Sequence, residues 1–537
     1  MPNAPPSDPV PGAAAFAESN DRRDASGAPD TRPVIRCVEG QMPAQVSEAE
    51  QALLEAGARI FQRDSMLVRV VRRESMSVRH YTRRPPGGLS IVMVDKPYLL
   101  EAMTRAARWE RYDKRSEKWR VCNAPDQIAV TYQSRMGLWR LPRLIAAISA
   151  PTLRPDGSIL QTPGYDEATA TWYDPCGVEY APVPEAPTMA QASDALDELL
   201  WAFRTFPFRE DCDRSVALAL ALTALVRRSL PAAPMGAISA PLRGSGKTLL
   251  ADCIAILAAG VSASAMQYPE SDEEAAKTAL AVLAEGDSVV LIDNVERPLQ
   301  GEWLCTVLTS ETFRGRVLGL SKMLSVPTST LFLATGNHLV VSGDLSTRTL
   351  LCFIDPHLEK PEEREFDGDL RVWFSQHRPR LVVAGLTVMR ACILCDLRQR
   401  SALKPFGRFE AWSDLVRRPL VWLGQEDPCK SLHVLERDDP QRIELLQMMQ
   451  AWGAVFGNES KTAREAVAEA TDETYVSGKG KALRDAMEAV AADRAGQINL
   501  KRLGKWLSRN AGRICDGREF IKAGERDHVL MWKLTGG

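Results

Sequence analysis

The chain has 537 residues, of which 45% are hydrophobic and 25% are charged, and its formal net charge is −2. This is the balance of a soluble globular protein, and the length predicts three or four domains. No apolar run reaches the roughly 20 residues that a membrane-spanning helix needs, and the N-terminus lacks the pattern of a secretion signal. We therefore expect a cytoplasmic protein that does not associate with a membrane.

The small net charge conceals an uneven distribution along the chain. Residues 61–145 hold 18 Lys and Arg against 8 Asp and Glu, and residues 494–537 hold 10 against 4. The remainder of the chain is therefore strongly acidic. Two basic segments around an acidic middle indicate two surfaces for a polyanion and one catalytic body between them.

The eleven cysteines are scattered, and only Cys392 and Cys395 form a CxxC pair. The residues around this pair predict a helix, and no second pair or nearby histidine completes a tetrahedral zinc site. We therefore expect buried structural thiols at these positions, and no disulfide bonds in a reducing cytoplasm.

The first third of the chain predicts a tail and a basic domain. Residues 1–34 are rich in Ala, Pro, Ser and Asp and lack periodicity, which predicts a disordered tail. Residues 35–179 predict a basic α+β domain, followed by a Pro-rich linker over residues 180–189. The expected elements of the basic domain are strands at Met66–Val71 and Leu89–Val94 and helices at Tyr98–Trp109 and Leu138–Ile148.

The rest of the chain predicts three further units. Residues 190–360 alternate apolar strands with helices, which is the pattern of a doubly wound sheet. Residues 361–479 predict a helical lid and a connecting region. Residues 480–537 predict two helices followed by two short strands, near Arg513–Cys515 and Val529–Leu534, which is the order of a winged-helix domain.

A glycine-containing turn separates an apolar strand at Met235–Ser239 from an apolar helix at Thr248–Ala259. A phosphate site needs inward-pointing N–H groups, a helix N-terminus, a lysine and a hydroxyl for Mg²⁺, and this turn supplies each of them. We therefore expect a P-loop that binds ATP and Mg²⁺, although Pro241 stands at the position of the usual first glycine. The expected cofactor-binding residues are Arg243, Gly244, Ser245, Gly246, Lys247, Thr248 and Leu249, with Lys247 also catalytic and Thr248 a magnesium ligand.

Ser288–Asp293 is an apolar strand that ends in a carboxylate. In P-loop ATPases such a strand neighbours the P-loop strand, and its aspartate holds Mg²⁺ through water. We therefore expect Asp293 to be a metal-binding and catalytic residue. The next residue is Asn294, where many such enzymes carry a catalytic glutamate, and Glu296 could orient the attacking water in its place. Both are candidate catalytic residues.

A second apolar strand, Thr330–Asn337, also ends in a polar residue. We expect Asn337 to lie beside Asp293 and to bond the attacking water or the γ-phosphate. Arg348 follows eleven residues later. It could stabilise transition-state charge in the site of a neighbouring subunit, or it could simply be a loop arginine paired with Asp344.

The P-loop, the acidic strand, Asn337 and Arg348, in this order, resemble AAA+ ATPases of the superfamily 3 helicase type. That group includes the C-terminal halves of phage and plasmid primase–helicases. The resemblance implies a hexameric ring and a β-hairpin before the Asn337 strand, whose basic tip grips single-stranded DNA. Residues 316–327 occupy that position, with Lys322 at the expected tip, although Lys322 could equally be a solvated surface residue.

Four short segments extend this resemblance to ATP-binding proteins of prophages and integrative elements. These segments are Ala150–Gly157, Pro163–Asp166, Thr335–His338 and Phe409–Trp412. The resemblance implies a role in replicating a phage or another mobile genetic element. A primase or nuclease would need a carboxylate cluster outside the core, and the sequence shows none.

Both basic segments are candidate DNA-binding surfaces. Seven arginines lie between residues 63 and 84, including Arg72 and Arg73, and further along aromatic residues interleave with arginines and lysines. This pattern suits a platform for single-stranded DNA, or else a solvated face over core aromatics. Near the C-terminus, Lys501, Arg502 and Lys505 have near-helical spacing, which suits a helix lying on DNA, although winged-helix domains also dock proteins.

We therefore predict an α/β protein with a P-loop AAA+ core and helical subdomains, a basic α+β N-terminal domain and a C-terminal winged-helix-like domain. The expected function is that of an ATP-hydrolysing DNA helicase or translocase that works as a homo-oligomer, in a hexameric ring, on single-stranded DNA. Because Asn294 replaces a glutamate, an ATP-switched DNA-binding scaffold or loader with little hydrolysis is the alternative.

Overall fold

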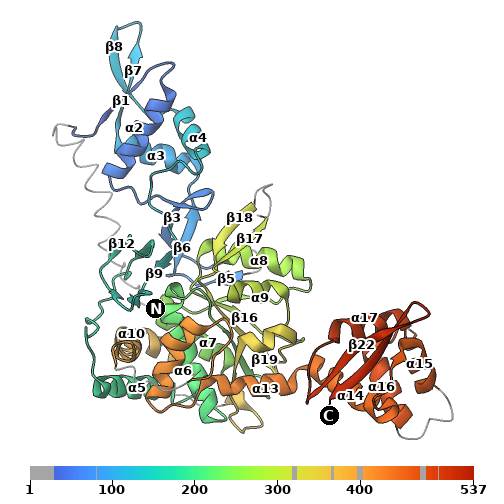
Figure 1. Ribbon diagram of the computed structural model, residues 1–537. Helices are drawn as coiled ribbons and strands as arrows, with labels where there is room; N and C mark the ends of the chain where they lie inside the picture. Colours follow the sequence, from blue (N-terminus) through green and yellow to red (C-terminus); the bar gives the residue numbers. More distant parts are fainter. Residues whose placement is uncertain are drawn as a thin grey trace, which may run out of the picture.

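The computed structural model describes residues 30–79, 82–316, 323–363, 368–395, 403–471, 479–493 and 495–536. Figure 1 shows an N-terminal lobe at the top, a central body, and a C-terminal lobe to one side. Among the helices described, none combines the length and the apolar character needed to cross a bilayer.

A seven-stranded sheet forms the middle of the central body, in the order β20-β14-β19-β16-β15-β5-β4. The five strands that follow residue 234 pair in parallel. They are almost continuously apolar because both faces of the sheet are buried. The bounds are β4 (Ser77–Arg79), β5 (Thr82–Arg84), β14 (Met235–Ala240), β15 (Ser264–Met266), β16 (Val289–Ile292), β19 (Leu331–Asn337) and β20 (Thr349–Phe353).

Helices cover both faces of this sheet. Successive strand residues point to opposite faces, so Leu291 and Leu333 pack in one core while Val290 and Phe332 pack in the other. The first core holds α5 (Met189–Phe203), α6 (Asp211–Val226), α7 (Lys247–Ala259) and α10 (Leu370–Leu394), and the second holds α8 (Asp272–Glu285) and α9 (Glu302–Thr309). The predicted α/β architecture around a parallel sheet is confirmed at this level.

Part of the expected helical lid is built into the central body. Helix α10 packs beside α7 in the first core, together with Phe406 and Trp412 from the chain beyond it. The short helices α11 (Glu410–Trp412) and α12 (Arg418–Trp422) belong to the same region. The prediction of a separate lid from residue 361 onward was therefore wrong for this part of the chain.

The N-terminal lobe has a core of its own, which includes Leu53, Leu99, Trp109 and Tyr132. Its strands form one sheet in the order β1-β7-β8, with β1 parallel to β7. The elements are β1 (Val34–Cys37), α2 (Met42–Glu55), α3 (Lys96–Ala106), β7 (Arg108–Asp113), β8 (Lys118–Cys122) and α4 (Asp126–Ser134). Trp109, expected at the end of a helix, lies in β7 instead.

Between α2 and α3 the chain leaves this lobe and joins the central body. The strands β2 (Phe61–Arg63), β3 (Met66–Arg72) and β6 (Leu89–Met93) form a small sheet, and β5 pairs antiparallel with β15 of the main sheet. The predicted boundary at residue 179 was therefore wrong as a division between independent domains, because β4 and β5 complete the sheet of the central body.

The helix predicted at Leu138–Ile148 was also wrong. Residues 138–145 contain no helix, and Ala146–Ile148 form strand β9. Pro142 accounts for this, because proline disfavours a helix interior. The next strands are β10 (Thr152–Leu153), β11 (Ile159–Leu160), β12 (Gly164–Asp166) and β13 (Thr171–Tyr173). In the expected linker, Val183 is buried and the Tyr180 hydroxyl donates to Ser149 O at 3.0 Å, so this segment packs on the body.

The C-terminal lobe begins earlier than the sequence predicts. Its core includes Leu445 and Trp452, so it starts with α14 near residue 440 and not at residue 480. The first predicted strand is also displaced, from Arg513–Cys515 to β22. Helix α13 (Ser431–Asp438) precedes the lobe, and its Leu435 packs in the second core of the central body. The elements of the lobe are α14 (Pro440–Phe456), β21 (Lys461–Thr462), α15 (Ala463–Thr471), α16 (Lys479–Ala491), α17 (Leu500–Asn510), β22 (Arg518–Arg526) and β23 (Val529–Gly536).

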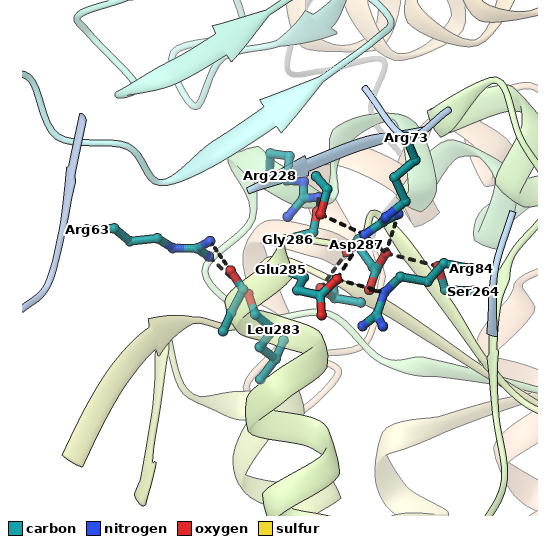
Figure 2. A network of polar contacts seen from close by, with 12 residues as sticks. Arg63, Arg73, Arg84, Arg228, Ser264, Leu283, Glu285, Gly286 and Asp287 are labelled. Atoms are coloured by element: carbon teal, nitrogen blue, oxygen red, sulfur yellow. Dashed lines mark hydrogen bonds and ion pairs between the residues drawn. The ribbon is translucent and has the colours of Figure 1, made fainter. Parts of the chain in front are cut away.

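Arginines from the N-terminal strands attach to the central body at the carboxyl end of α8 (Figure 2). Arg63 donates to the carbonyl oxygens of Leu283 at 3.0 Å and Ala284 at 2.7 Å. Cations stabilise a helix at this end because its carbonyl dipoles point outward. Arg84 is fully buried, and its Nε lies 2.8 Å from Asp287 Oδ2. Strand β16 runs from this cluster to Asp293.

We expect Asp287→Asn to destabilise the fold by about 3–5 kcal/mol, because removing one charge of a buried pair leaves the other uncompensated. Asp287 is 4% exposed and contacts Arg73, Arg84 and Ser264. The Nη atoms of Arg84 have no hydrogen-bond partner among the described residues. Urea unfolding followed by circular dichroism measures the change.

The matched control is Lys277→Ala, which removes an exposed ion pair with Glu273 on the same helix that ends at this cluster. Such pairs contribute roughly 0.3–0.5 kcal/mol, so the control should unfold close to the unsubstituted protein. Equal unfolding midpoints for Asp287→Asn and the unsubstituted protein would contradict the role given to this ion pair.

Candidate active site

A cavity of about 350 Å³ lies at the carboxyl edge of the main sheet, where β14, β16 and β19 end. Parallel strands bring their ends to the same edge, so side chains far apart in the sequence meet there. The residues that line the cavity are Arg243, Gly244, Ser245, Gly246, Lys247, Thr248, Leu249, Asp293, Asn294, Thr335 and Asn337. All seven expected cofactor-binding residues are therefore in one place.

The turn between β14 and α7 has the backbone conformation of a phosphate-binding loop. Gly244 has φ 78° and Gly246 has φ 98°, a region where a side chain would be strained. The N–H groups of residues 243–246 donate no hydrogen bond to any described residue. These N–H groups lie beside the N-terminus of α7 with no acceptor among the described residues, an arrangement that attracts phosphate oxygens.

Lys247 spans the cavity from the first residue of α7. Its Nζ donates to Asn337 Oδ1 at 2.7 Å and to Leu242 O at 2.9 Å. Burial lowers the pKa of Lys247, and the nearby Asp293 carboxylate acts in the opposite direction. Because Asn337 accepts from the lysine through its oxygen, its amide NH₂ group is left to donate to a ligand.

Asp293 receives two hydroxyl groups on one oxygen. Thr248 donates to Asp293 Oδ1 at 3.2 Å, and Thr335 donates to the same atom at 2.6 Å. A threonine hydroxyl and a carboxylate are hard oxygen donors of the kind that Mg²⁺ prefers, so this set fits the expected ion. Thr335 was missed by the sequence interpretation, although a polar residue within the apolar strand Leu331–Asn337 was a signal for it.

The order of the strands corrects one expectation. The acidic strand β16 does not neighbour the P-loop strand β14, because β19 lies between them and pairs in parallel with both. Asp293 and Asn337 do come from adjacent strands, as expected. Asn337 therefore lies beside the P-loop, opposite Ala240, and it can reach Lys247 directly.

Asn294 and Glu296 lie differently with respect to the cavity. Asn294 lines it and has φ 53°, a left-handed conformation that Asn adopts more readily than most residues. Its Nδ2 donates to Glu296 Oε1 at 3.0 Å, and Glu296 is exposed outside the lining. Among the residues that line the cavity, Asp293 is the only carboxylate.

Arg348 lies at the opposite edge of the sheet from its own cavity. Thr349 pairs with Met235 at the start of β14, whereas the P-loop comes after the end of that strand. Six strand residues cover roughly 20 Å. The guanidinium donates to Cys305 O at 3.0 Å and Thr309 Oγ1 at 3.3 Å, and it is 4.0 Å from Asp344. The contact with Asp344, which was the alternative to a role in a neighbouring subunit, is thus present but long.

The candidate DNA contacts have mixed outcomes. A hairpin of β17 (Thr312–Arg316) and β18 (Met323–Pro327) precedes β19, and Lys322 lies outside the described residues. Arg72 is exposed, and its Nε donates to Gly87 O at 3.2 Å. The expectation for Arg73 was wrong: its side chain is 10% exposed and is paired with Glu285 and Asp287, which removes it from a DNA surface.

Helix α17 presents the C-terminal basic residues on one face. Lys501, Arg502 and Lys505 are exposed, whereas Leu503 and Leu507 are buried against the lobe. Arg502 also donates to the carbonyl oxygen of Ala492. The near-helical spacing seen in the sequence thus corresponds to a real exposed cationic face.

Comparisons with known proteins give matches among solved structures only. Neither protein-family models nor curated proteins match the chain. The A-form apo structure of the NrS-1 C-terminal region has 11% identity and a TM-score of 0.35, over 91% of this chain and 98% of that one. SCCmec type IV Cch, an active helicase, has 9% identity and a TM-score of 0.32, over 89% and 97%. At TM-scores this low, the likeness carries no argument about the activity of this chain.

We expect Lys247→Ala to weaken the binding of ATP by about 10- to 100-fold, because hydrogen bonds to a charged group contribute about 1.5–3 kcal/mol. Titration of a fluorescent ATP analogue in the presence of Mg²⁺ measures the affinity. The control is Lys430→Ala, an exposed lysine paired with Glu426 outside the cavity lining, which should bind as the unsubstituted protein does. Unchanged affinity in Lys247→Ala would exclude the cavity as the triphosphate site.

Proposed function

We propose that this protein is an ATPase that uses hydrolysis to move along or separate DNA, as a helicase or translocase for the replication of a phage or another mobile genetic element. The observation that carries the proposal is the convergence of Lys247, Thr248, Asp293 and Asn337 on one cavity. In this proposal the free N–H groups of residues 243–246 hold the phosphates. A Mg²⁺ ion held by Thr248 and Asp293 would neutralise phosphate charge.

Asn337 and Lys247 have distinct roles in the proposed reaction. Lys247 compensates the charge of the terminal phosphates, and the Asn337 amide donates to the γ-phosphate or to the attacking water. Their hydrogen bond at 2.7 Å supports a shared task, because it holds both groups at one point of the cavity.

The position of Arg348 supports an assembly of several copies. Because Arg348 lies at the edge of the sheet opposite its own cavity, any contact it makes to a nucleotide would be in the cavity of another chain, as in a ring of identical subunits. The β17–β18 hairpin and the exposed cations of α17 support DNA as the partner, since a polyanion binds through such groups.

A switch with little hydrolysis is the second candidate, and one observation favours it. Asn294 occupies the cavity where a catalytic carboxylate is needed, and it holds Glu296 outside the lining. In that case ATP would bind through the same residues and change how the protein binds DNA. Slow hydrolysis would then set the lifetime of the ATP-bound state.

Phosphate release by the purified chain, with and without single-stranded DNA, separates the two candidates. We expect single-stranded DNA to stimulate steady-state ATP turnover, because the proposed motor couples DNA binding to hydrolysis. We expect Lys247→Ala to abolish this turnover. Tight ATP binding with negligible turnover in the presence of DNA would rule out the motor and favour the switch.

We expect Arg348→Ala to retain ATP binding and to lose hydrolysis by about a thousandfold, the effect of removing an arginine that acts in a neighbour's site. Mixing this variant with Lys247→Ala tests the shared site directly. Mixed assemblies contain interfaces with an intact Lys247 and an intact neighbouring Arg348, so hydrolysis should return. A mixture as inactive as its two components would contradict a role across subunits.

A further inference from the structure

A second cavity, of about 670 Å³, lies in the N-terminal lobe and is lined in part by the β7–β8 hairpin. Figure 1 shows this hairpin at the top of the molecule. The hairpin forms one wall, and the amino ends of α2 and α4 form another. The lining residues are Cys37, Val38, Glu39, Gly40, Met42, Gln45, Arg111, Tyr112, Lys114, Trp119, Pro125, Gln127 and Ile128. Neither the P-loop nor the main sheet contributes to it.

Two aromatic side chains of the hairpin border this cavity. Tyr112 is 44% exposed, and its ring centroid lies 5.5 Å from that of Trp119, with the planes at 65°. Arg36 covers Trp119 with its guanidinium 4.8 Å from the ring centroid. An exposed aromatic costs free energy in water, and a planar base that stacks on it recovers part of that cost.

Cationic groups surround the aromatics. Arg111 and Lys114 line the cavity, and Arg115 and Lys118 continue along the same hairpin. Lys114, Arg115 and Lys118 have no ion-pair partner among the described residues, although other basic side chains of the hairpin do. Cations without an ion-pair partner among the described residues are available to the phosphates of a strand.

The floor of the cavity offers donors and acceptors. Helices α2 and α4 begin at the cavity without a side-chain cap. Pro43 has no N–H, and Gln45 N and Ile128 N donate to backbone carbonyls, so only part of each first turn lacks a hydrogen-bond acceptor among the described residues. Gln45 is 6% exposed and donates Nε2 to Val38 O at 2.7 Å, which leaves its Oε1 without a donor among the described residues. Amide oxygens and the Glu39 carboxylate can accept from base amino groups.

The wall formed by Cys37 is uncharged. Burial raises the pKa of the Cys37 thiol to about 11, and the neighbouring Cys122 thiol acts in the same direction. The thiol therefore carries no negative charge near neutral pH, and it does not repel a phosphate.

We propose that this cavity holds unpaired nucleotides of single-stranded DNA, with separate bases stacked on Tyr112 and on Trp119, whose planes are not parallel, and with phosphates on Arg111 and Lys114. A strand fits better than a free nucleotide, because Arg115 and Lys118 extend the cationic surface beyond the cavity. Duplex DNA does not fit, since its bases are stacked on one another and cannot reach the aromatic rings. The inference deepens the proposed function by locating where DNA is held, and it requires no nucleotide at the P-loop.

Fluorescence anisotropy of a labelled oligo-dT, with the full chain and without ATP, tests this inference. We expect Tyr112→Ala and Trp119→Ala each to weaken binding by about 5- to 150-fold, the effect of losing one base–aromatic stack. Trp119→Phe should restore most of the affinity, because it keeps a stacking face. Lys114→Ala should weaken binding to all sequences and reduce the salt dependence by about one counterion.

Abasic oligonucleotides identify the stacking contribution. The unsubstituted chain should bind an abasic strand less tightly than oligo-dT, and the double variant Tyr112→Ala/Trp119→Ala should bind the two alike. Trp201→Ala is the matched control, since Trp201 is an exposed aromatic on α5, far along the chain from the hairpin. Thermal unfolding midpoints identify any variant that fails to fold. For such a variant, ultraviolet cross-linking of the unsubstituted chain to oligo-dT should map to residues 108–122.

Three results would overturn the inference. The first is equal binding of oligo-dT by Tyr112→Ala, Trp119→Ala and the unsubstituted chain, and the second is equal binding of abasic and normal strands by the unsubstituted chain. The third is full competition by free dTMP at the same concentration as oligo-dT. The proposed ATPase function has a separate test, because Lys247→Ala should bind oligo-dT normally in this assay. If the chain shows no ATP hydrolysis but binds oligo-dT through its aromatic residues, only the proposed ATPase function fails. If it hydrolyses ATP but the aromatic variants bind oligo-dT normally, only the proposed nucleotide site in this cavity fails.

Discussion

One carboxylate oxygen joins the elements of the candidate active site. Asp293 Oδ1 accepts hydroxyl groups from Thr248 at the start of α7 and from Thr335 on β19. The acidic strand, the central strand and the P-loop helix are therefore fixed at a single atom. The Lys247–Asn337 hydrogen bond makes a second connection across the same strand. Every proposed contact to a triphosphate depends on these two connections, because they set the positions of the donors before the ligand arrives.

The strand that carries Asp293 is held at both ends. Asp287 precedes β16 and is paired with Arg73 and Arg84, and Asp293 follows it at the cavity. Only buried apolar residues, Val289–Ile292, lie in the strand itself. A short, fully packed strand responds as a unit, since close-packed interiors transmit displacements and do not absorb them. The N-terminal strands and the cavity are thus connected by a rigid element of the sheet.

The features that were predictable from the sequence are local ones. A lysine and a threonine after glycines, between an apolar strand and an apolar helix, define a P-loop within ten residues, and those side chains line the cavity. An apolar strand ending in Asp293 or in Asn337 is equally local. The position of β19 between β14 and β16 was not predictable in this way, because the order of strands depends on packing between distant segments.

The wrong predictions for the domain boundary and for Arg73 also arise because contacts between distant segments decide both features. The strands β4 and β5 have three residues each, contain arginines and lack apolar alternation, so nothing in them indicated a place in the main sheet. Arg73 belongs to a basic run, and its carboxylate partners lie more than 200 residues away. Charge counts locate cations along a chain, but they do not distinguish those that face solvent from those that meet buried acids.

The antiparallel pairing of β5 with β15 has a practical consequence for anyone dividing this protein into fragments. A fragment cut at the proline-rich segment near residue 180 would retain β15 with its backbone N–H and C=O groups exposed along one side. Open strand edges of this kind recruit other strands and promote aggregation. Asp287 and Glu285 would at the same time lose the guanidinium groups of Arg73 and Arg84. Fragments for crystallisation or enzymology therefore need residues from about 60 onward, so that the sheet keeps its natural border.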